Sequence, residues 1–187
     1  YGLQGFDPEN EGTAISGIAT TTATVPTAGF PSATTVDVYV QASCSVTGTS
    51  TDWVGPVSFV TPCSAITVNA DNPYTEAFNS GSMPMCWGEE IITGSTSWDF
   101  YSGYAHFNYT PGASARLVSP VFNLSTTGAY QVEFDHAEPD YSGGADSLWL
   151  YYRTSATAEW VRLGQYGNHS SSMEHAIVLL PNPSATY

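Results

Sequence analysis

Acidic side chains crowd one segment of the chain, residues 133–146, which reads EFDHAEPDYSGGAD. Carboxylate and carbonyl oxygens are the ligands that Ca²⁺ prefers, and Asp140 and Asp146 stand at the two shoulders of the Gly-rich turn. The spacing matches neither an EF-hand nor another fixed calcium loop, so a solvated acidic loop is the alternative. Two carboxylates across a cleft would also suit a glycosidase, but among 17 acids some pair meets that requirement by chance.

The cysteines are three in number, Cys44, Cys63 and Cys86, and no CxxC pair occurs. A reactive thiol needs a base or a cation nearby, whereas Glu89 and Glu90 follow Cys86 closely and would oppose formation of the thiolate. A Cys63–Cys86 disulfide would instead close a loop of about 24 residues and contribute about 3–4 kcal/mol in the chain-entropy model. We therefore predict this disulfide over a free buried thiol or a catalytic cysteine. Cys44 then either forms no disulfide or has its partner in strands of the first domain that this sequence lacks.

Aromatic side chains gather in residues 98–109, and strand geometry limits how they can be arranged. Because alternate residues of a strand face opposite sides of a sheet, not all of these rings can lie in a core. Exposed Trp and Tyr rings stack on sugar rings, and carboxylate oxygens accept hydrogen bonds from hydroxyl groups. We therefore take Trp98, Asp99, Tyr101 and Tyr104 as candidates for contact with a glycan or a protein. The alternative is an ordinary sandwich core with cross-strand aromatic pairs. A second cluster shares this ambiguity: Tyr141, Trp149, Tyr151 and Tyr152.

Histidines and hydroxyl groups form no recognisable catalytic pattern, since neither GxSxG nor HExxH occurs. In the strand expected over residues 129–138, Glu133 and Asp135 share one face, and Phe134 and His136 share the other. An imidazole on an apolar face is more often a hydrogen-bonded core group than a base. No set of residues amounts to an active site, so the sequence predicts a noncatalytic protein.

The chain is strongly acidic: 17 Asp and Glu stand against three Arg, for a formal net charge of −14. This charge repels nucleic-acid phosphates and anionic membrane surfaces, so neither is an expected partner, and it favours cations such as Ca²⁺. The longest apolar runs, such as residues 176–180, are far too short to span a bilayer, and membrane insertion is not expected. Abundant Ser and Thr, the lack of Lys and the 12 Tyr are typical of an exported protein. We expect a secreted or cell-surface, extracellular location.

Strand patterns run through nearly the whole chain, and no segment keeps a helical i, i+3, i+4, i+7 pattern for three turns. In residues 34–44, Val36 and Val38 alternate with Asp37 and Tyr39, which is the period of a half-buried strand. The sequence therefore predicts an all-β protein.

A change of composition divides the chain. Pro, Asn and Asp interrupt the strands over residues 63–72, which we predict to be a linker. The first domain then covers residues 1–62 and the second covers residues 73–187. The first is too short for a seven-stranded sandwich of about 100 residues. We expect the first domain to be incomplete at its N-terminus and the second at its C-terminus.

Two strands near the end of the first domain carry a family resemblance. Residues 36–42 read VDVYVQA, a polar hairpin follows, and residues 53–62 read WVGPVSFVTP. The residues that fit the pattern are Val36, Tyr39, Val40, Ala42, Trp53, Gly55, Pro56, Val57 and Phe59. They resemble the last two strands, YxVxVxA and WxGPVxFxTP, of a bacterial fibronectin type III domain. The resemblance implies an incomplete sandwich of that fold over residues 1–62.

Four motifs follow in order along the second domain: PYTEAF, PMCW, RLVSPVFNL and DSLWLYYRTS. They resemble the MAM-like and cleaved-adhesin-like domains of secreted bacterial surface proteins, and the tandem with a fibronectin type III domain is typical of type IX-secreted proteins. The resemblance implies a concanavalin-like jelly-roll β-sandwich over residues 73–187. In many related domains an acid follows the opening phenylalanine and binds a structural calcium. Asn79 stands at that position here and supplies only a neutral oxygen, so the expected metal ligands are Asn79, Asp140 and Asp146.

A modification site and a function follow from the same comparison. The tripeptide Asp146-Ser147-Leu148 resembles the acid–Ser/Thr–aliphatic pattern of bacterial surface O-glycosylation, which makes Ser147 a candidate acceptor. The resemblances imply noncatalytic adhesion or ligand-binding modules of a large secreted cell-surface protein. The expected partners are an extracellular glycan, a surface protein, or further copies or modules of the same chain. The alternatives are an accessory targeting module of an extracellular hydrolase and a structural stalk or filament repeat.

Overall fold

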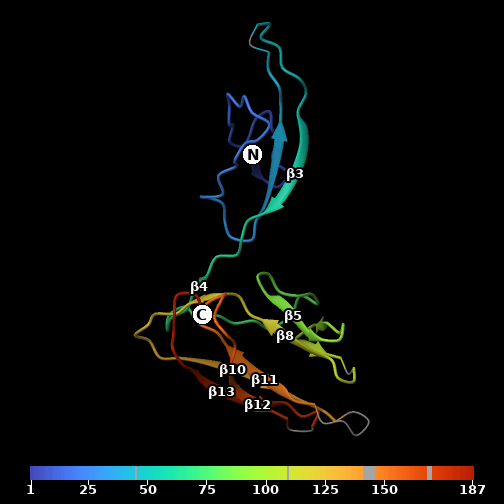
Figure 1. The fold of residues 1–187 in the computed structure, drawn as a ribbon, viewed down its shortest axis with the longest axis vertical. Coiled ribbons are helices and arrows are strands. Elements are labelled where there is room, and N and C mark those ends of the chain that lie inside the picture. Colours follow the sequence, from blue (N-terminus) through green and yellow to red (C-terminus); the bar gives the residue numbers. More distant parts are fainter. Residues whose placement is uncertain (45, 109, 141–145, 168–169) are drawn as a thin grey trace. The chain divides into compact units, whose positions relative to one another are not determined.

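The structure, a computed structural model, describes residues 1–187 except 45, 109, 141–145 and 168–169 (Figure 1). The described residues form strands, turns and loops but no helix, which confirms the predicted all-β class. In this part of the chain there is accordingly no helix long and apolar enough to cross a membrane. The strands are β1 (Gly2–Leu3), β2 (Thr35–Val40), β3 (Val54–Val60), β4 (Ile66–Thr67), β5 (Gly88–Thr93), β6 (Trp98–Tyr101), β7 (Tyr104–Phe107), β8 (Ser114–Val118), β9 (Phe122–Asn123), β10 (Tyr130–His136), β11 (Leu148–Tyr152), β12 (Val161–Tyr166) and β13 (Glu174–Leu180).

The chain divides into two compact units, Tyr1–Ser64 and Ala65–Tyr187. The division falls inside the segment predicted to be a linker. Strand β4 of that segment pairs in parallel with β9, which places Ile66 beside Phe122. Part of the expected linker is therefore built into the second unit.

Unit 1 is built on a three-stranded antiparallel sheet in the order β1-β2-β3. Val36 of β2 is fully buried, and its neighbour Asp37 is only 3% exposed, so both faces of β2 are covered at this point. The alternating pattern predicts an exposed Asp37, and this prediction is wrong. Its carboxylate accepts a hydrogen bond from the Ser58 hydroxyl at 2.6 Å and another from the Gly5 N–H at 2.8 Å. These two donors replace water around the buried charge.

Unit 2 contains four antiparallel pairs, β5–β8, β6–β7, β10–β13 and β11–β12, together with the parallel pair β4–β9. The β10–β13 pair runs in regular register from Tyr130 opposite Leu180 to His136 opposite Glu174. The register of β5–β8 and of β11–β12 shifts once in each pair. Several small sheets of this kind are consistent with a β-sandwich.

Aromatic contacts hold the opening segment of unit 2. The Trp87 Nε1–H donates to the Tyr74 hydroxyl at 2.9 Å, and the rings of Phe78 and Trp87 lie 5.2 Å apart. The ring of Tyr74 lies 5.1 Å from that of Phe122, which follows β8 in the chain. Buried apolar side chains are few among the described residues, namely Val36 and Leu124. Half-buried aromatic rings therefore provide much of the packing.

Candidate ligand-binding site

The candidate site lies on the β6–β7 hairpin, whose two strands are joined by the residues Ser102 and Gly103. Gly103 has a φ of +100°, a backbone conformation that glycine adopts without steric cost. Its N–H donates to the carbonyl oxygen of Phe78 at 3.1 Å, which fixes the turn to the opening segment of unit 2. The Phe78 ring also lies 6.1 Å from that of Phe100. The hairpin is thus held at its turn and along one face.

The two faces of the hairpin differ in exposure, as alternation requires. Trp98, Phe100 and Phe107 are half-buried, and the rings of Trp98 and Phe107 lie 5.5 Å apart. Asp99, Tyr101, Tyr104 and His106 are exposed on the opposite face. We call these four residues the hairpin face. Of the predicted ligand-binding residues, the structure brings together Asp99, Tyr101 and Tyr104 and places Trp98 on the packed side.

The hairpin face carries a stacked pair of tyrosines. Tyr101 and Tyr104 are cross-strand partners, with ring centroids 5.2 Å apart and planes inclined by 25°. They remain 45% and 44% exposed. His106, which sequence reasoning did not single out, lies 6.0 Å from the Tyr101 ring and opposite Asp99 in the register. This arrangement offers two stacked, partly exposed aromatic rings beside a carboxylate and an imidazole.

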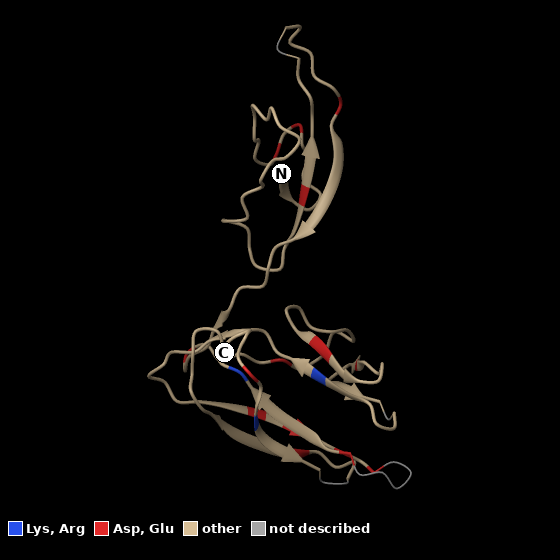
Figure 2. Cartoon of the chain, in the orientation of Figure 1, with Lys and Arg blue, Asp and Glu red and all other residues tan. Residues whose placement is uncertain are grey.

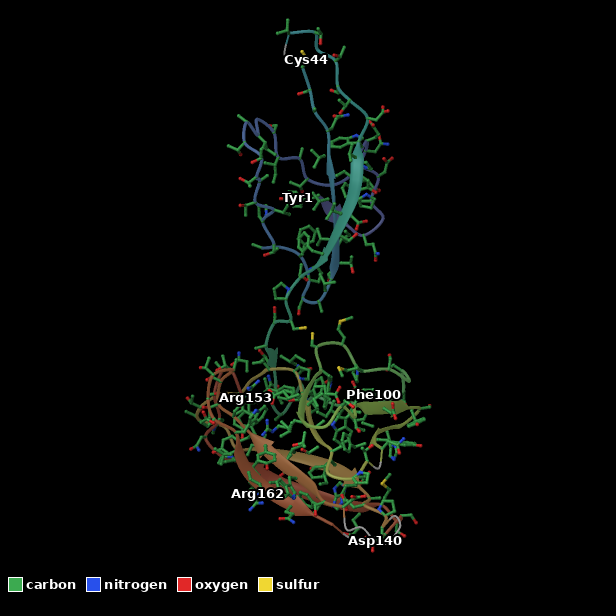
Figure 3. All side chains as sticks on the ribbon, turned by 45° about the vertical axis from the view of Figure 1, so that its right-hand side comes forward. Tyr1, Cys44, Phe100, Asp140, Arg153 and Arg162 are labelled. Atoms are coloured by element: carbon green, nitrogen blue, oxygen red, sulfur yellow. The ribbon has the colours of Figure 1, made fainter. Side chains whose placement is uncertain are left out.

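The predicted metal ligands lie in different places. Asn79 is exposed and directly follows Phe78, so it lies near the turn of the hairpin. Asp140 and Asp146 are also exposed and flank residues 141–145, which are outside the described residues. Figure 3 shows Asp140 and Phe100 of the hairpin in separate parts of unit 2. Among the described residues, no group of three or more His, Cys, Asp or Glu is placed to hold a metal ion.

The remaining candidates from the sequence are placed as follows. Ser147 is exposed, as an acceptor for a glycan must be. Tyr141, from the second aromatic cluster, lies outside the described residues, whereas Trp149 of the same cluster is 48% exposed. His136 is 7% exposed and holds its Nδ1 at 3.0 Å from Oε1 of the equally buried Glu138. It is therefore a hydrogen-bonded core residue, as expected.

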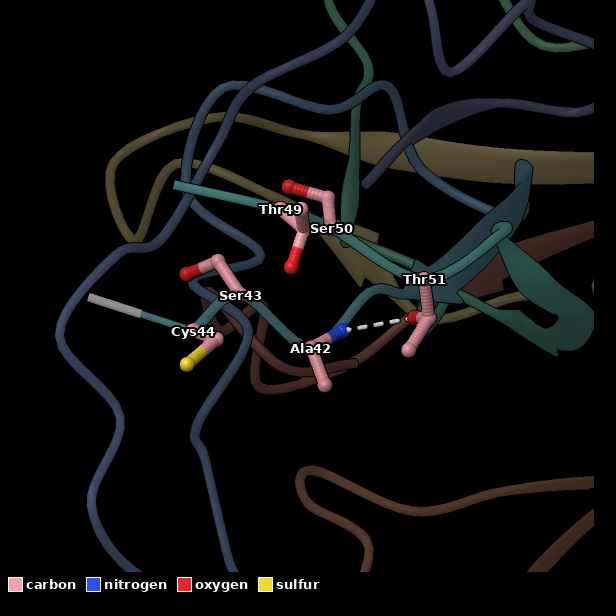
Figure 4. A pocket seen from close by; sticks show the side chains of 6 residues that line it. All are labelled: Ala42, Ser43, Cys44, Thr49, Ser50 and Thr51. Carbon is pink, nitrogen blue, oxygen red and sulfur yellow. Dashed lines mark hydrogen bonds between the residues drawn. The ribbon is translucent and has the colours of Figure 1, made fainter. Parts of the chain in front are cut away.

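The cysteines separate into a bonded pair and a free thiol. Cys63 and Cys86 form the predicted disulfide. Cys44 is free and exposed. The hydroxyl and N–H of Thr47, and then the N–H of Val46, hydrogen bond to its sulfur and lower the pKa of the thiol. A shallow pocket surrounds it, lined by Ala42, Ser43, Cys44, Thr49, Ser50 and Thr51 (Figure 4). The described residues that line this pocket include no histidine, arginine or carboxylate.

A second polar cluster was not anticipated from the sequence. Glu90 of β5 lies 2.8 Å from the Arg116 guanidinium and 3.7 Å from that of Arg153, and it accepts a hydrogen bond from Trp160 Nε1–H at 3.2 Å. Arg153 also lies over the Trp160 ring, 4.2 Å from its centroid. The sequence does hold one signal for this cluster, namely the scarcity of basic side chains. The three arginines are the only Lys or Arg residues of the chain, and all belong to unit 2 (Figure 2).

Comparisons with protein-family models, with curated proteins and with solved structures find no match to this chain.

Proposed function

We propose that the chain carries two noncatalytic modules of a secreted surface protein, and that the second binds an extracellular glycan through the hairpin face. The first module would be the last part of a fibronectin type III domain, and the second a MAM-like or adhesin-like jelly roll. The paired strands β2 and β3, and the small two-stranded sheets of unit 2, support this assignment. The four ordered sequence motifs of the second domain support it as well.

The observation that carries the proposal is the stacked and exposed pair of Tyr101 and Tyr104. Two stacked tyrosines of this exposure leave the outer faces and edges of their rings accessible, and tyrosine, which joins an apolar ring to a polar hydroxyl, is enriched at recognition surfaces. A pyranose ring has an apolar C–H face that fits such a ring face. Its hydroxyl groups would hydrogen bond to the carboxylate of Asp99 and to the imidazole of His106. No covalent step is required, and the proposed role is binding alone.

The test is a binding measurement of the whole chain with a panel of neutral oligosaccharides, followed by calorimetry on any that bind. Tyr101→Ala and Tyr104→Ala should each weaken binding by about tenfold, since truncation of a tyrosine anchor costs on the order of 1–2 kcal/mol. Tyr101→Phe is the matched control, because it keeps the ring and removes only the hydroxyl. It should bind within about threefold of the unaltered chain.

Two results would overturn the proposal. One is that no neutral oligosaccharide binds at millimolar concentration. The other is that the alanine variants, with unchanged melting temperatures, bind as well as the unaltered chain. In either case the hairpin face would be a solvated part of the surface, and a protein ligand would become the better candidate for unit 2.

A further inference from the structure

All three arginines of the chain place their guanidinium groups over aromatic rings, at cation–π distance. The Arg116 guanidinium lies 5.3 Å from the ring centroids of Tyr151 and of Trp160. The Arg153 guanidinium lies 4.2 Å from that of Trp160. The Arg162 guanidinium lies 5.3 Å from the centroid of Trp149. We call these residues the arginine surface: Arg116, Arg153, Arg162, Trp149, Tyr151 and Trp160.

The contacts link the arginine surface into one continuous array. Trp160 is shared by Arg116 and Arg153. Tyr151 contacts Arg116 and is the cross-strand partner of Arg162. The rings of Tyr151 and Trp149 lie 6.3 Å apart. The array therefore runs from β8 across β11 and β12, on strands other than those of the hairpin face.

The positive charge of this array is only partly neutralised. Glu90 is the one carboxylate within 4.0 Å of these guanidinium groups among the described residues, and it serves both Arg116 and Arg153. Its distance of 3.7 Å from Arg153 is too long for a hydrogen bond. The buried Nε of Arg116 has no hydrogen-bond partner in the described part of the chain. Arg162 is exposed and forms no ion pair with a described residue.

We propose that the arginine surface binds the carboxylate or sulfate groups of an acidic oligosaccharide. A guanidinium that lies over an aromatic ring has five N–H donors, and two of them can match the two oxygens of a carboxylate or sulfate. Trp149 is 48% exposed and provides a ring face for the sugar itself. An acidic peptide would use the guanidinium groups but has no flat C–H face for the tryptophan.

The global charge restricts the ligand further. The formal net charge of −14 repels long polyanions, because over the length of such a ligand the acidic groups of the chain outnumber its three arginines. An oligosaccharide of a few sugars carries a small total charge and avoids most of this repulsion, whereas a long nucleic acid, with a charge on every phosphate, does not. The inference concerns a different surface and a different ligand class from the hairpin face.

The experiment measures binding of the whole chain to oligogalacturonate, to a heparin-derived oligosaccharide, to cellohexaose and to oligoglutamate of similar length. The first two probes distinguish carboxylate from sulfate, and either of them should bind more tightly than cellohexaose does. Arg162→Gln should weaken that binding by about tenfold, the loss typical of one charge-assisted contact. Arg162→Lys keeps the charge but removes the planar fork, so it should restore only part of the affinity.

Tyr101→Ala serves as the matched control, because it alters the hairpin face and leaves the arginine surface unchanged. It should leave acidic-oligosaccharide binding unaltered, just as Arg162→Gln should leave neutral-oligosaccharide binding unaltered. Arg162 is exposed, so its replacement should not move the melting temperature, and Trp149→Phe provides a second, conservative variant. Failure of both acidic saccharides to bind, equal binding of oligoglutamate, or undiminished binding by Arg162→Gln would each overturn the proposal.

Discussion

Asp37 lies where β2 is covered on both faces, and its carboxylate is held by Ser58 and by the backbone of Gly5. The hydrogen bond from the Ser58 hydroxyl, and then that from the Gly5 N–H, hold the pKa of Asp37 below its ordinary value. Both donors stabilise the ionised form. A lowered pKa in the folded state makes the stability of unit 1 depend on pH in the acid range.

The pH dependence has a definite sign. The contribution of Asp37 is fully present above the unfolded pKa of about 3.9, and it is lost as pH falls through the lower folded value. Asp37→Asn should therefore flatten the decline in unfolding free energy of unit 1 below about pH 4. The measurement is the midpoint of urea unfolding at several pH values, monitored by the NMR signals of the backbone amides of β2. Asp52→Asn, at an exposed position of the same unit, is the control. An equally steep acid decline in Asp37→Asn would contradict this account.

At the scale of elements, Glu90 connects several strands of unit 2. It extends from β5 to Arg116 of β8, and it reaches Arg153 and Trp160, which lie between β11 and β12 in the chain. The side chains of the ion pairs are 26–35% exposed. Water therefore screens them in part, and their contribution should fall between that of a surface pair and that of a buried one.

Glu90→Gln tests this connection. Loss of the charge removes the carboxylate that lies 2.8 Å from the Arg116 guanidinium, so the unfolding free energy of unit 2 should fall by about 1–2 kcal/mol. Urea unfolding followed by tryptophan fluorescence is the measurement. Glu159→Gln removes an exposed charge next to Trp160 and should change stability by less than about 0.5 kcal/mol. Equal effects of the two substitutions would show that Glu90 acts only through the net charge of the chain.

Local patterns predict the strands better than they predict their partners. Residues 129–138 alternate, and β10 forms there with Phe134 turned inward and Asp135 outward. The burial of Asp37 could not be foreseen, because its donors come from Gly5 and Ser58, which are distant in sequence. The same limit applies to the hairpin face.

Alternation shows that Trp98 and Tyr101 face opposite ways, but it does not tell which face is covered. That depends on contacts with Phe78, twenty residues or more away. The convergence of three arginines from β8, β12 and the segment after β11 is likewise a property of the tertiary structure. Sequence reasoning therefore located the aromatic segments correctly and could not assign their exposed sides.

At the scale of the whole molecule, charge is the dominant property. A net charge of −14 attracts cations to the chain electrostatically. Calcium binding by Asp140 and Asp146, with Asn79 as a further candidate, stays a prediction. Asp140 and Asp146 are both exposed, so either can reach an ion in solution.

Calcium should raise the melting temperature of unit 2, because an ion that binds only the folded state stabilises it by mass action. The measurement is differential scanning calorimetry in the presence of calcium at about 1 mM, which is on the order of the dissociation constants of extracellular calcium modules. Asp140→Asn combined with Asp146→Asn should remove the shift, and magnesium at the same concentration controls for general screening. An identical melting temperature with calcium and with a chelator would count against the site.

The Cys63–Cys86 disulfide has a consequence for the survival of the chain among proteases. It encloses residues 64–85, most of which are exposed, and this segment contains the backbone connection from unit 1 to unit 2. A cut anywhere within it leaves two peptides joined through sulfur. Such a nicked chain should run as one band on a non-reducing gel and as two bands after reduction. In a chain cut within this segment, the disulfide alone keeps the two units attached, so a reducing environment would separate them.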